Sequence, residues 1–333
     1  MSKTRLVLLA LAFILAATSA FAADLRTYRC YRVASPPRID GLLDDETWKC
    51  LPASNSFRNL LDENYTDKQT YLKLGWDDSN LYIGVRCDEP EMKLISAKMG
   101  DGDALWTEDS IEIFFQPEPG PSYFQFAVNS LGAKVGAERA SGLTHFEAKG
   151  YHGPDFYTLE VRMPFALFGK PPKSGDMWRG VINRNIWAGG KVFSCWTPLQ
   201  GSFHDTANFG RFIFDAEPGT PELAASIEKS DPSDKQYREA LVARINDAVK
   251  KCKEYEPELA AALGLPAYKA EAQEYQKRIG DYRAHQESIP TASLKDLAAG
   301  TRSCEDFFKK LFDFKYRVLL AKLLAESDSG EKK

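Results

Sequence analysis

The spacing of hydrophobic residues changes once along this 333-residue chain, and that change most constrains its fold. Up to about residue 216, apolar and polar residues alternate in short runs separated by Gly, Pro and Asp, which is typical of β-strands. From about residue 222, apolar residues recur every three or four positions, which is typical of amphipathic helices. The sequence therefore predicts an all-β sandwich over residues 23–216, a Pro- and Gly-containing linker at 217–221 and a small all-α domain over 222–333.

Alternation is clear in the two segments 110–115 and 124–129. Ile111, Ile113, Phe124, Phe126 and Val128 are expected to face the core. The side chains expected on the opposite face are Ser110, Glu112, Phe114, Gln125, Ala127 and Asn129.

The C-terminal region carries three apolar seams, at Tyr237–Tyr255, Tyr268–Tyr282 and Phe307–Val318. They predict three helices in a bundle or a coiled-coil hairpin. Such a seam either forms the core of its own domain or pairs with another chain. Self-association or a protein partner bound by these helices is therefore a second prediction.

The first residues have the pattern of a signal peptide. Lys3 and Arg5 precede the apolar run 6–17, and Ala20-Phe21-Ala22 fits a cleavage site before Ala23. We expect residues 1–22 to be removed and the mature protein to be exported, to the periplasm or the medium. Without that segment the formal net charge falls from −4 to −6, which argues against nucleic acid and anionic membranes as partners. No other apolar run is long enough for a membrane span.

Six cysteines lie in the predicted mature part, and an even number in an exported chain permits disulfides. None has the spacing of a zinc site. Cys30 with Cys50, and Cys252 with Cys304, are the expected pairs. Cys87 and Cys195 lie within strand patterns and are expected to be buried thiols.

Trp106 lies in a polar loop directly before the strand that carries Glu112. A flat apolar ring beside a hydrogen-bond acceptor is a typical arrangement for sugar binding. The alternative is a core Trp beside a solvated Glu. Glycoside hydrolysis needs two facing carboxylates, whereas Asp109 and Glu112 lie three positions apart on a strand and are expected on opposite faces, about 10 Å from each other. The sequence therefore predicts a binding protein without catalysis, compatible with an accessory role in glycoside hydrolysis.

Four motifs occur in a recognisable order. They are Pro37-Arg38-Ile39-Asp40-Gly41 with Trp48, Trp76-Asp77 with Leu81-Tyr82, Trp106-Thr107-Glu108-Asp109-Ser110-Ile111-Glu112-Ile113-Phe114, and Phe209-Gly210 with Phe212. Over residues 31–214 this order resembles carbohydrate-binding module family nine, within the DOMON-like sandwich group. The resemblance implies an immunoglobulin-like or jelly-roll-like sandwich that binds oligosaccharide or polysaccharide in a degradative or cell-surface context. The helical region has no part in the resemblance.

The resemblance also implies site residues. Trp106 and Phe203 match two rings that clamp a sugar, with Phe203 where the family has Trp. Glu112 and Asn129 match polar residues that read the sugar hydroxyls. Ala127 stands where the family has Arg, which removes a bidentate donor. Two residues could compensate for it, Gln125 and Arg184.

The resemblance points to two further types of site, a calcium site and a haem site. The resemblance implies structural calcium, for which Asp101 and Asp103 are oxygen ligands of the right kind, although a metal-free Asp/Gly turn is the alternative. Some DOMON-like sandwiches bind b-type haem through Met and His. The candidate haem ligands here are Met92, Met99, His145, His152 and His204.

Overall fold

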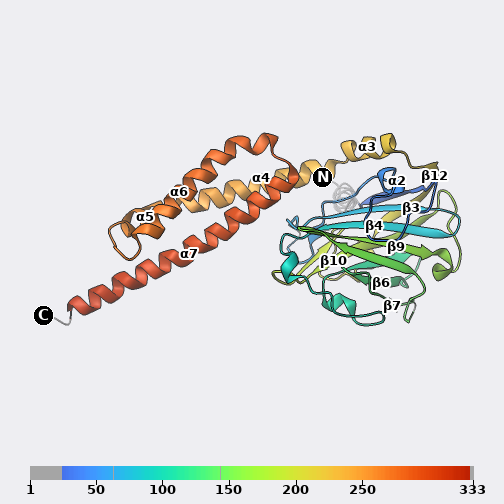
Figure 1. Cartoon of the computed structure of the whole chain (residues 1–333), viewed down its shortest axis with the longest axis horizontal. Helices are drawn as coiled ribbons and strands as arrows, with labels where there is room; N and C mark the ends of the chain where they lie inside the picture. Colours follow the sequence, from blue (N-terminus) through green and yellow to red (C-terminus); the bar gives the residue numbers. More distant parts are fainter. Residues whose placement is uncertain (1–24, 63, 143, 331–333) are drawn as a thin grey trace, which may run out of the picture. The chain divides into compact units, whose positions relative to one another are not determined.

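The computed structural model describes residues 25–62, 64–142 and 144–330 (Figure 1). The predicted signal peptide at 1–22 lies outside the described residues. The chain divides into two compact units at Ser230/Asp231, here called the β unit and the helical unit. The prediction of a β-sandwich followed by a helical region is confirmed.

The strands of the β unit form one hydrogen-bonded ladder. They are β1 (Thr27–Arg32), β2 (Arg58–Asn59), β3 (Thr70–Trp76), β4 (Asn80–Asp88), β5 (Ser110–Gln116), β6 (Phe124–Asn129), β7 (Lys134–Glu138), β8 (Glu147–His152), β9 (Phe156–Pro164), β10 (Met177–Ile186), β11 (Val192–Cys195) and β12 (Gly210–Pro218). The order is β7-β6-β5-β10-β12-β1-β3-β4-β9-β8, with β11 and β2 branching from β10. β1 pairs in parallel with β3 and β12, and the other pairings among the described strands are antiparallel.

The ladder folds over so that its two halves enclose one hydrophobic core. Ile83 and Val85 from β4 lie in this core with Ile111 and Ile113 from β5. The expected alternation of β5 and β6 is therefore observed, because the apolar positions face the core and the polar positions form a second face. That second face positions the site described below.

The short helices of the β unit are α2 (Glu46–Lys49), η1 (Met92–Leu94), η2 (Leu105–Thr107), η3 (Phe165–Phe168), η4 (Thr206–Asn208) and α3 (Pro221–Ser230). α3 moves the domain boundary. Leu223 and Ile227 pack on a small cluster around Trp48, and the Glu228 carboxylate accepts a hydrogen bond from the Ala53 N–H at 2.6 Å. The linker expected at 217–221 is therefore displaced to Ser230/Asp231, because an amphipathic helix that belongs to the β unit has the same spacing as the helices that follow it.

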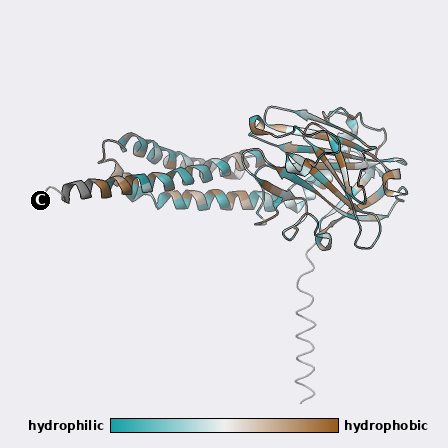
Figure 2. Ribbon diagram, turned by 90° about the horizontal axis from the view of Figure 1, so that it is seen from below, coloured by the Kyte–Doolittle hydropathy of each residue, from teal (hydrophilic) through white to brown (hydrophobic). Residues whose placement is uncertain are grey.

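The helical unit contains α4 (Pro232–Lys253), α5 (Glu256–Ala262), α6 (Lys269–His285), η5 (Gln286–Thr291) and α7 (Leu294–Gly330). α6 and α7 are antiparallel, since Tyr268 contacts Phe314 and Tyr282 contacts Phe307. Figure 2 shows hydrophobic and hydrophilic residues interspersed along these helices. The predicted seam is buried inside the unit, with Phe307, Leu311 and Phe314 at most 1 % exposed. A partner for the helices stays a prediction.

All six cysteines fall within the described residues, and all are free thiols. Neither expected disulfide is formed. Cys30 points into the sheet core, whereas Cys50 ends α2 and is half-buried. Cys252 lies in the core of the helical unit. Among the described residues, no helix combines the length and the hydropathy needed to cross a membrane.

Candidate ligand-binding site

A cavity of about 600 Å³ opens on the second face of β5, β6 and β10. Its floor is polar and includes Glu112, Gln125 and Asn185. Its walls carry aromatic side chains, among them Trp106, Trp187, Phe193 and Phe203. A concave site with apolar walls and a few converging polar groups is the usual form of a small-molecule site.

The floor is organised around the Glu112 carboxylate. Strand pairing places Asn183 opposite Glu112 and Asn185 opposite Ser110. The Asn185 amide donates to one Glu112 oxygen at 2.8 Å, and the Gln125 amide donates to the other at 2.6 Å. These contacts fix the carboxylate and leave it acceptor capacity, because each carboxylate oxygen has a second lone pair.

Burial sets the charge state of this floor. Glu112 is 4 % exposed, and removal from water raises its pKa above the usual value, against the opposing effect of the two amide donors. Protonation would replace an acceptor by a donor on that oxygen. The floor is therefore sensitive to mildly acidic pH.

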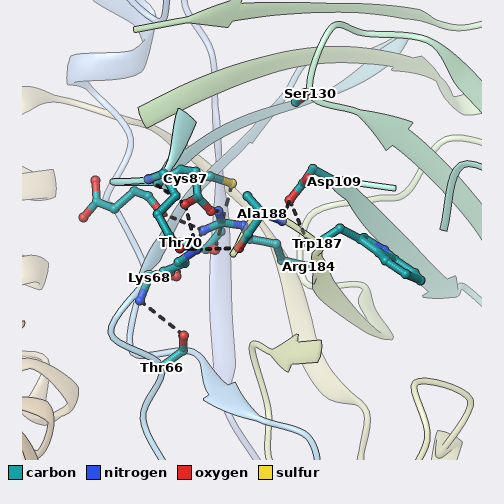
Figure 3. A network of polar contacts seen from close by, with 12 residues as sticks. Thr66, Lys68, Thr70, Cys87, Asp109, Ser130, Arg184, Trp187 and Ala188 are labelled. Atoms are coloured by element: carbon teal, nitrogen blue, oxygen red, sulfur yellow. Dashed lines mark hydrogen bonds and ion pairs between the residues drawn. The ribbon is translucent and has the colours of Figure 1, made fainter. Parts of the chain in front are cut away.

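Trp106 and Trp187 form one end of the cavity, and two acidic side chains hold their loops. Glu108 accepts a hydrogen bond from the Lys98 N–H at 2.7 Å. Asp109 accepts from the Trp187 N–H at 2.9 Å (Figure 3). It also accepts from the Ser96 N–H at 2.8 Å. Both carboxylates are almost fully buried, whereas Trp106 is 37 % exposed. The motif residues Glu108 and Asp109 thus support the ring that precedes them.

A further part of the cavity wall comes from the loop after β11. Phe203 contacts Phe193, with ring centroids 5.8 Å apart. His204 lies edge-on to Phe114, and its Nδ1 is 2.7 Å from the Tyr123 hydroxyl. Phe203 is only 7 % exposed, so it offers a ligand much less area than Trp106 does.

Two sequence-predicted site residues lie elsewhere. The Asn129 amide donates to Glu108 at 2.7 Å, and its oxygen accepts from the Ala133 N–H, so Asn129 braces the Trp106 loop from below. Arg184 is fully buried and donates to the Lys68 carbonyl (Figure 3). It also donates to the Asp88 carbonyl and pairs with Glu89 at 3.1 Å. Arg184 therefore cannot compensate for Ala127 at the ligand site.

The proposed calcium ligands do not fit a metal site. Asp101 pairs with the Lys134 ammonium at 2.9 Å, and Asp103 accepts from the Gly100 N–H. An ammonium at the carboxylate takes the place that a cation would need. The described residues contain no group of three or more His, Cys, Asp or Glu that could hold a metal ion.

The candidate haem ligands are mostly engaged with protein partners. His152 bonds the Ser130 hydroxyl at 3.0 Å, and His204 bonds Tyr123. Met99 accepts from the Thr107 hydroxyl, and Met92 packs against the core. Haem binding stays a prediction without a ligand pair.

Part of the cavity wall consists of residues that no sequence pattern marks. Trp187 and Lys191 come from the turn between β10 and β11, where no periodic pattern marks a direction, and Phe193 lies on the short strand β11. Asn185 could have been found, because it alternates with core residues on β10 as Glu112 does on β5.

Solved structures similar to this chain include a carbohydrate-binding module family 9 from Caldicellulosiruptor kristjanssonii in complex with cellotriose. It has 20% sequence identity and a TM-score of 0.45, and the match covers 57% of this chain and 94% of that one. The same module in complex with glucose has 20% sequence identity and a TM-score of 0.45, and the match covers 58% of this chain and 98% of that one. A putative carbohydrate-binding protein from Bacteroides uniformis has 17% sequence identity and a TM-score of 0.45, and the match covers 58% of this chain and 100% of that one.

No curated protein matches the chain in sequence. The model of a protein family described as carbohydrate family 9 binding domain-like matches residues 39–216, which is more than half of the chain. Among the described strands, this range contains β2 to β11 and most of β12, together with every residue that lines the cavity. The chain therefore belongs to the carbohydrate family 9 binding domain-like family.

Proposed function

We propose that the protein binds a saccharide reversibly in this cavity and does not transform it. A sugar ring would stack on Trp106 while its hydroxyls bond Glu112, Gln125 and Asn185. The observation that carries the proposal is a half-exposed indole beside a polar floor whose side chains are already held in place. Family membership is consistent with it.

Binding without catalysis follows from the acidic residues. Glycoside hydrolysis uses two carboxyl groups that both reach the bond to be cleaved. Asp109 is fully buried, with both oxygens bonded to backbone N–H groups, so it is not offered to a ligand beside Glu112. A shallow site of this kind gives dissociation constants on the order of micromolar to millimolar.

Export and biological context belong to the same proposal. The signal-peptide pattern at residues 1–22 supports a periplasmic or extracellular protein. There the protein would hold saccharide near enzymes that degrade polysaccharide or at a cell surface. N-terminal sequencing of the exported protein should start at Ala23 or within two residues of it.

The test is a calorimetric titration of the mature protein with mono-, di- and oligosaccharides, after a glycan-array screen. Losing a stacked ring costs about 1–3 kcal/mol, so Trp106→Ala should weaken binding by roughly ten- to a hundredfold. The melting temperature should hardly change, because Trp106 is half-exposed.

Tyr151→Ala is the matched control, since Tyr151 is an exposed aromatic residue on β8, outside the cavity. This variant should bind as the wild type does. Absence of saccharide binding across the panel, or unfolding of Trp106→Ala, would contradict the proposal.

A further inference from the structure

The cavity lining carries a lysine that forms no ion pair with a carboxylate of the described residues. Lys191 follows the Gly189-Gly190 turn between β10 and β11 and lines the cavity. Its Nζ lies 4.7 Å from the ring centroid of Trp187 and 5.0 Å from that of Phe193. Among the described residues, no carboxylate oxygen forms an ion pair with this ammonium, whose contacts are with ring faces instead.

The exposed acidic and basic residues of the cavity lining lie on or beside different strands of the sheet. Glu138, the exposed acidic residue of the lining, ends β7, whereas Lys191 precedes β11. The strand order β7-β6-β5-β10 with β11 beside β10 puts four inter-strand steps between them. At about 4.8 Å a step, the two side chains are roughly 19 Å apart along the floor. An anionic group at Lys191 is therefore not opposed by Glu138.

The acid between these ends is shielded. Both Glu112 oxygens accept amide hydrogen bonds, and the side chain is almost fully buried. In the β5–β6 pairing, the residue opposite Glu112 is Ala127, which carries no charge. Among the described residues, Lys191 is the one lysine or arginine that lines the cavity.

We propose that Lys191 makes the cavity selective for saccharides that carry an anionic substituent, a carboxylate or a sulfate. This inference rests on the proposed saccharide binding. A sugar stacked against the aromatic wall would place its acidic substituent at the ammonium above Trp187 and Phe193. The rings restrict the lysine to this region, so less conformational freedom is lost when the ion pair forms.

The experiment compares matched sugars by calorimetric titration at low and high salt. The two series are glucose, glucuronic acid and glucose 6-sulfate, and galactose, galacturonic acid and galactose 6-sulfate. Within the series that binds, the wild type should bind an acidic form about three- to tenfold more tightly than the neutral form. The preference should shrink in 0.5 M salt, because screening weakens an ion pair at the mouth of the cavity. The uronate and sulfate arms show which anion is preferred.

Three variants separate charge from packing. Lys191→Gln should bring the ratio of the dissociation constants of the neutral and acidic forms close to one, and Lys191→Arg should keep the wild-type ratio. Lys170→Gln, at an exposed lysine outside the cavity, should behave as the wild type does.

Equal affinity for neutral and acidic forms, or a preference that survives in Lys191→Gln, would overturn the inference and leave saccharide binding intact. No binding of any of the six sugars would also overturn it. The broader saccharide panel then decides separately whether the proposed function stands.

Discussion

Individual acidic residues in this site have different tasks although they lie close together in the sequence. Glu108 and Asp109 accept backbone N–H groups and hold loops, whereas Glu112 faces the cavity. The difference follows from strand geometry, because Glu112 lies on the second face of β5 and Asp109 directly precedes the strand. Glu108 and Asp109 therefore position the loops, whereas Glu112, held by two side-chain amides, lines the cavity and is available to a ligand.

Glu112 makes binding and stability depend on pH in opposite directions. Its pKa is raised by burial, so the folded state holds its proton at pH values where the unfolded chain has released it. The contribution of Glu112 to the free energy of unfolding is therefore larger below this raised pKa and declines as the pH rises through it. Saccharide affinity should instead fall as the pH drops through the same range, because the ionised acceptor is lost.

Titrations and denaturant melts between pH 4 and pH 8 test this, with Glu112→Gln as the reference. The variant should bind more weakly than the wild type at pH 7, and its affinity should not depend on pH over this range. A wild type whose affinity is the same at pH 4.5 and pH 7 would show that Glu112 does not contact the ligand.

At the scale of elements, one buried carboxylate joins the first motif to the sheet. Glu160 on β9 accepts hydrogen bonds from the N–H groups of Asp40, Gly41 and Leu43 and from the Trp48 indole. Gly41 has φ +91°, and a Cβ there would lie 2.8 Å from the Gly150 backbone. The motif around Asp40-Gly41 and Trp48 is thus a docking loop for β9.

Glu160→Ala should destabilise the β unit by about 2–4 kcal/mol, because four donors lose one acceptor at a buried position. Glu147→Ala, at an exposed acid on the neighbouring strand β8, is the control and should cost at most about 1 kcal/mol. Denaturant unfolding measures both. Equal effects of the two substitutions would mean that water replaces Glu160 at the loop.

Strand faces could be predicted from the sequence, but neighbours across the sheet could not. Glu112 and Gln125 lie on the cavity face, as the alternation predicts. The face on which a side chain lies depends only on its position within its own strand. Arg184 alternates onto the core face and is stabilised there by Glu89, a partner 95 residues away that no local pattern reveals. Lys191 and Trp187 lie in a turn, where side-chain direction depends on backbone dihedrals and not on a period.

For the whole molecule, the boundary between the units decides which fragments fold. α3 covers the cluster of Trp48 and Leu51 with Leu223 and Ile227 and belongs to the β unit. A protein ending at residue 216 would expose that cluster and lose the Glu228 contact with Ala53. The sequence pattern alone predicts that residues 23–216 contain the whole β-sandwich domain.

We therefore expect a fragment of residues 25–230 to melt several degrees above a fragment of residues 25–216. Both should show β-type circular dichroism, and residues 231–333 should be mainly helical. Coincident melting of the two β fragments would place the boundary back at 217–221.

The most direct measurement of the central claim uses the six tryptophans as reporters. Trp106 and Trp187 line the cavity, whereas Trp48, Trp76, Trp178 and Trp196 are at most 4 % exposed and lie in the core clusters. The indole N–H resonances of the ¹⁵N-labelled mature protein should be recorded while a saccharide is added. Those of Trp106 and Trp187 should shift with saturation, and the other four should stay in place. Saturable shifts confined to the core tryptophans, or no shift with any saccharide of the panel, would contradict a binding site in this cavity.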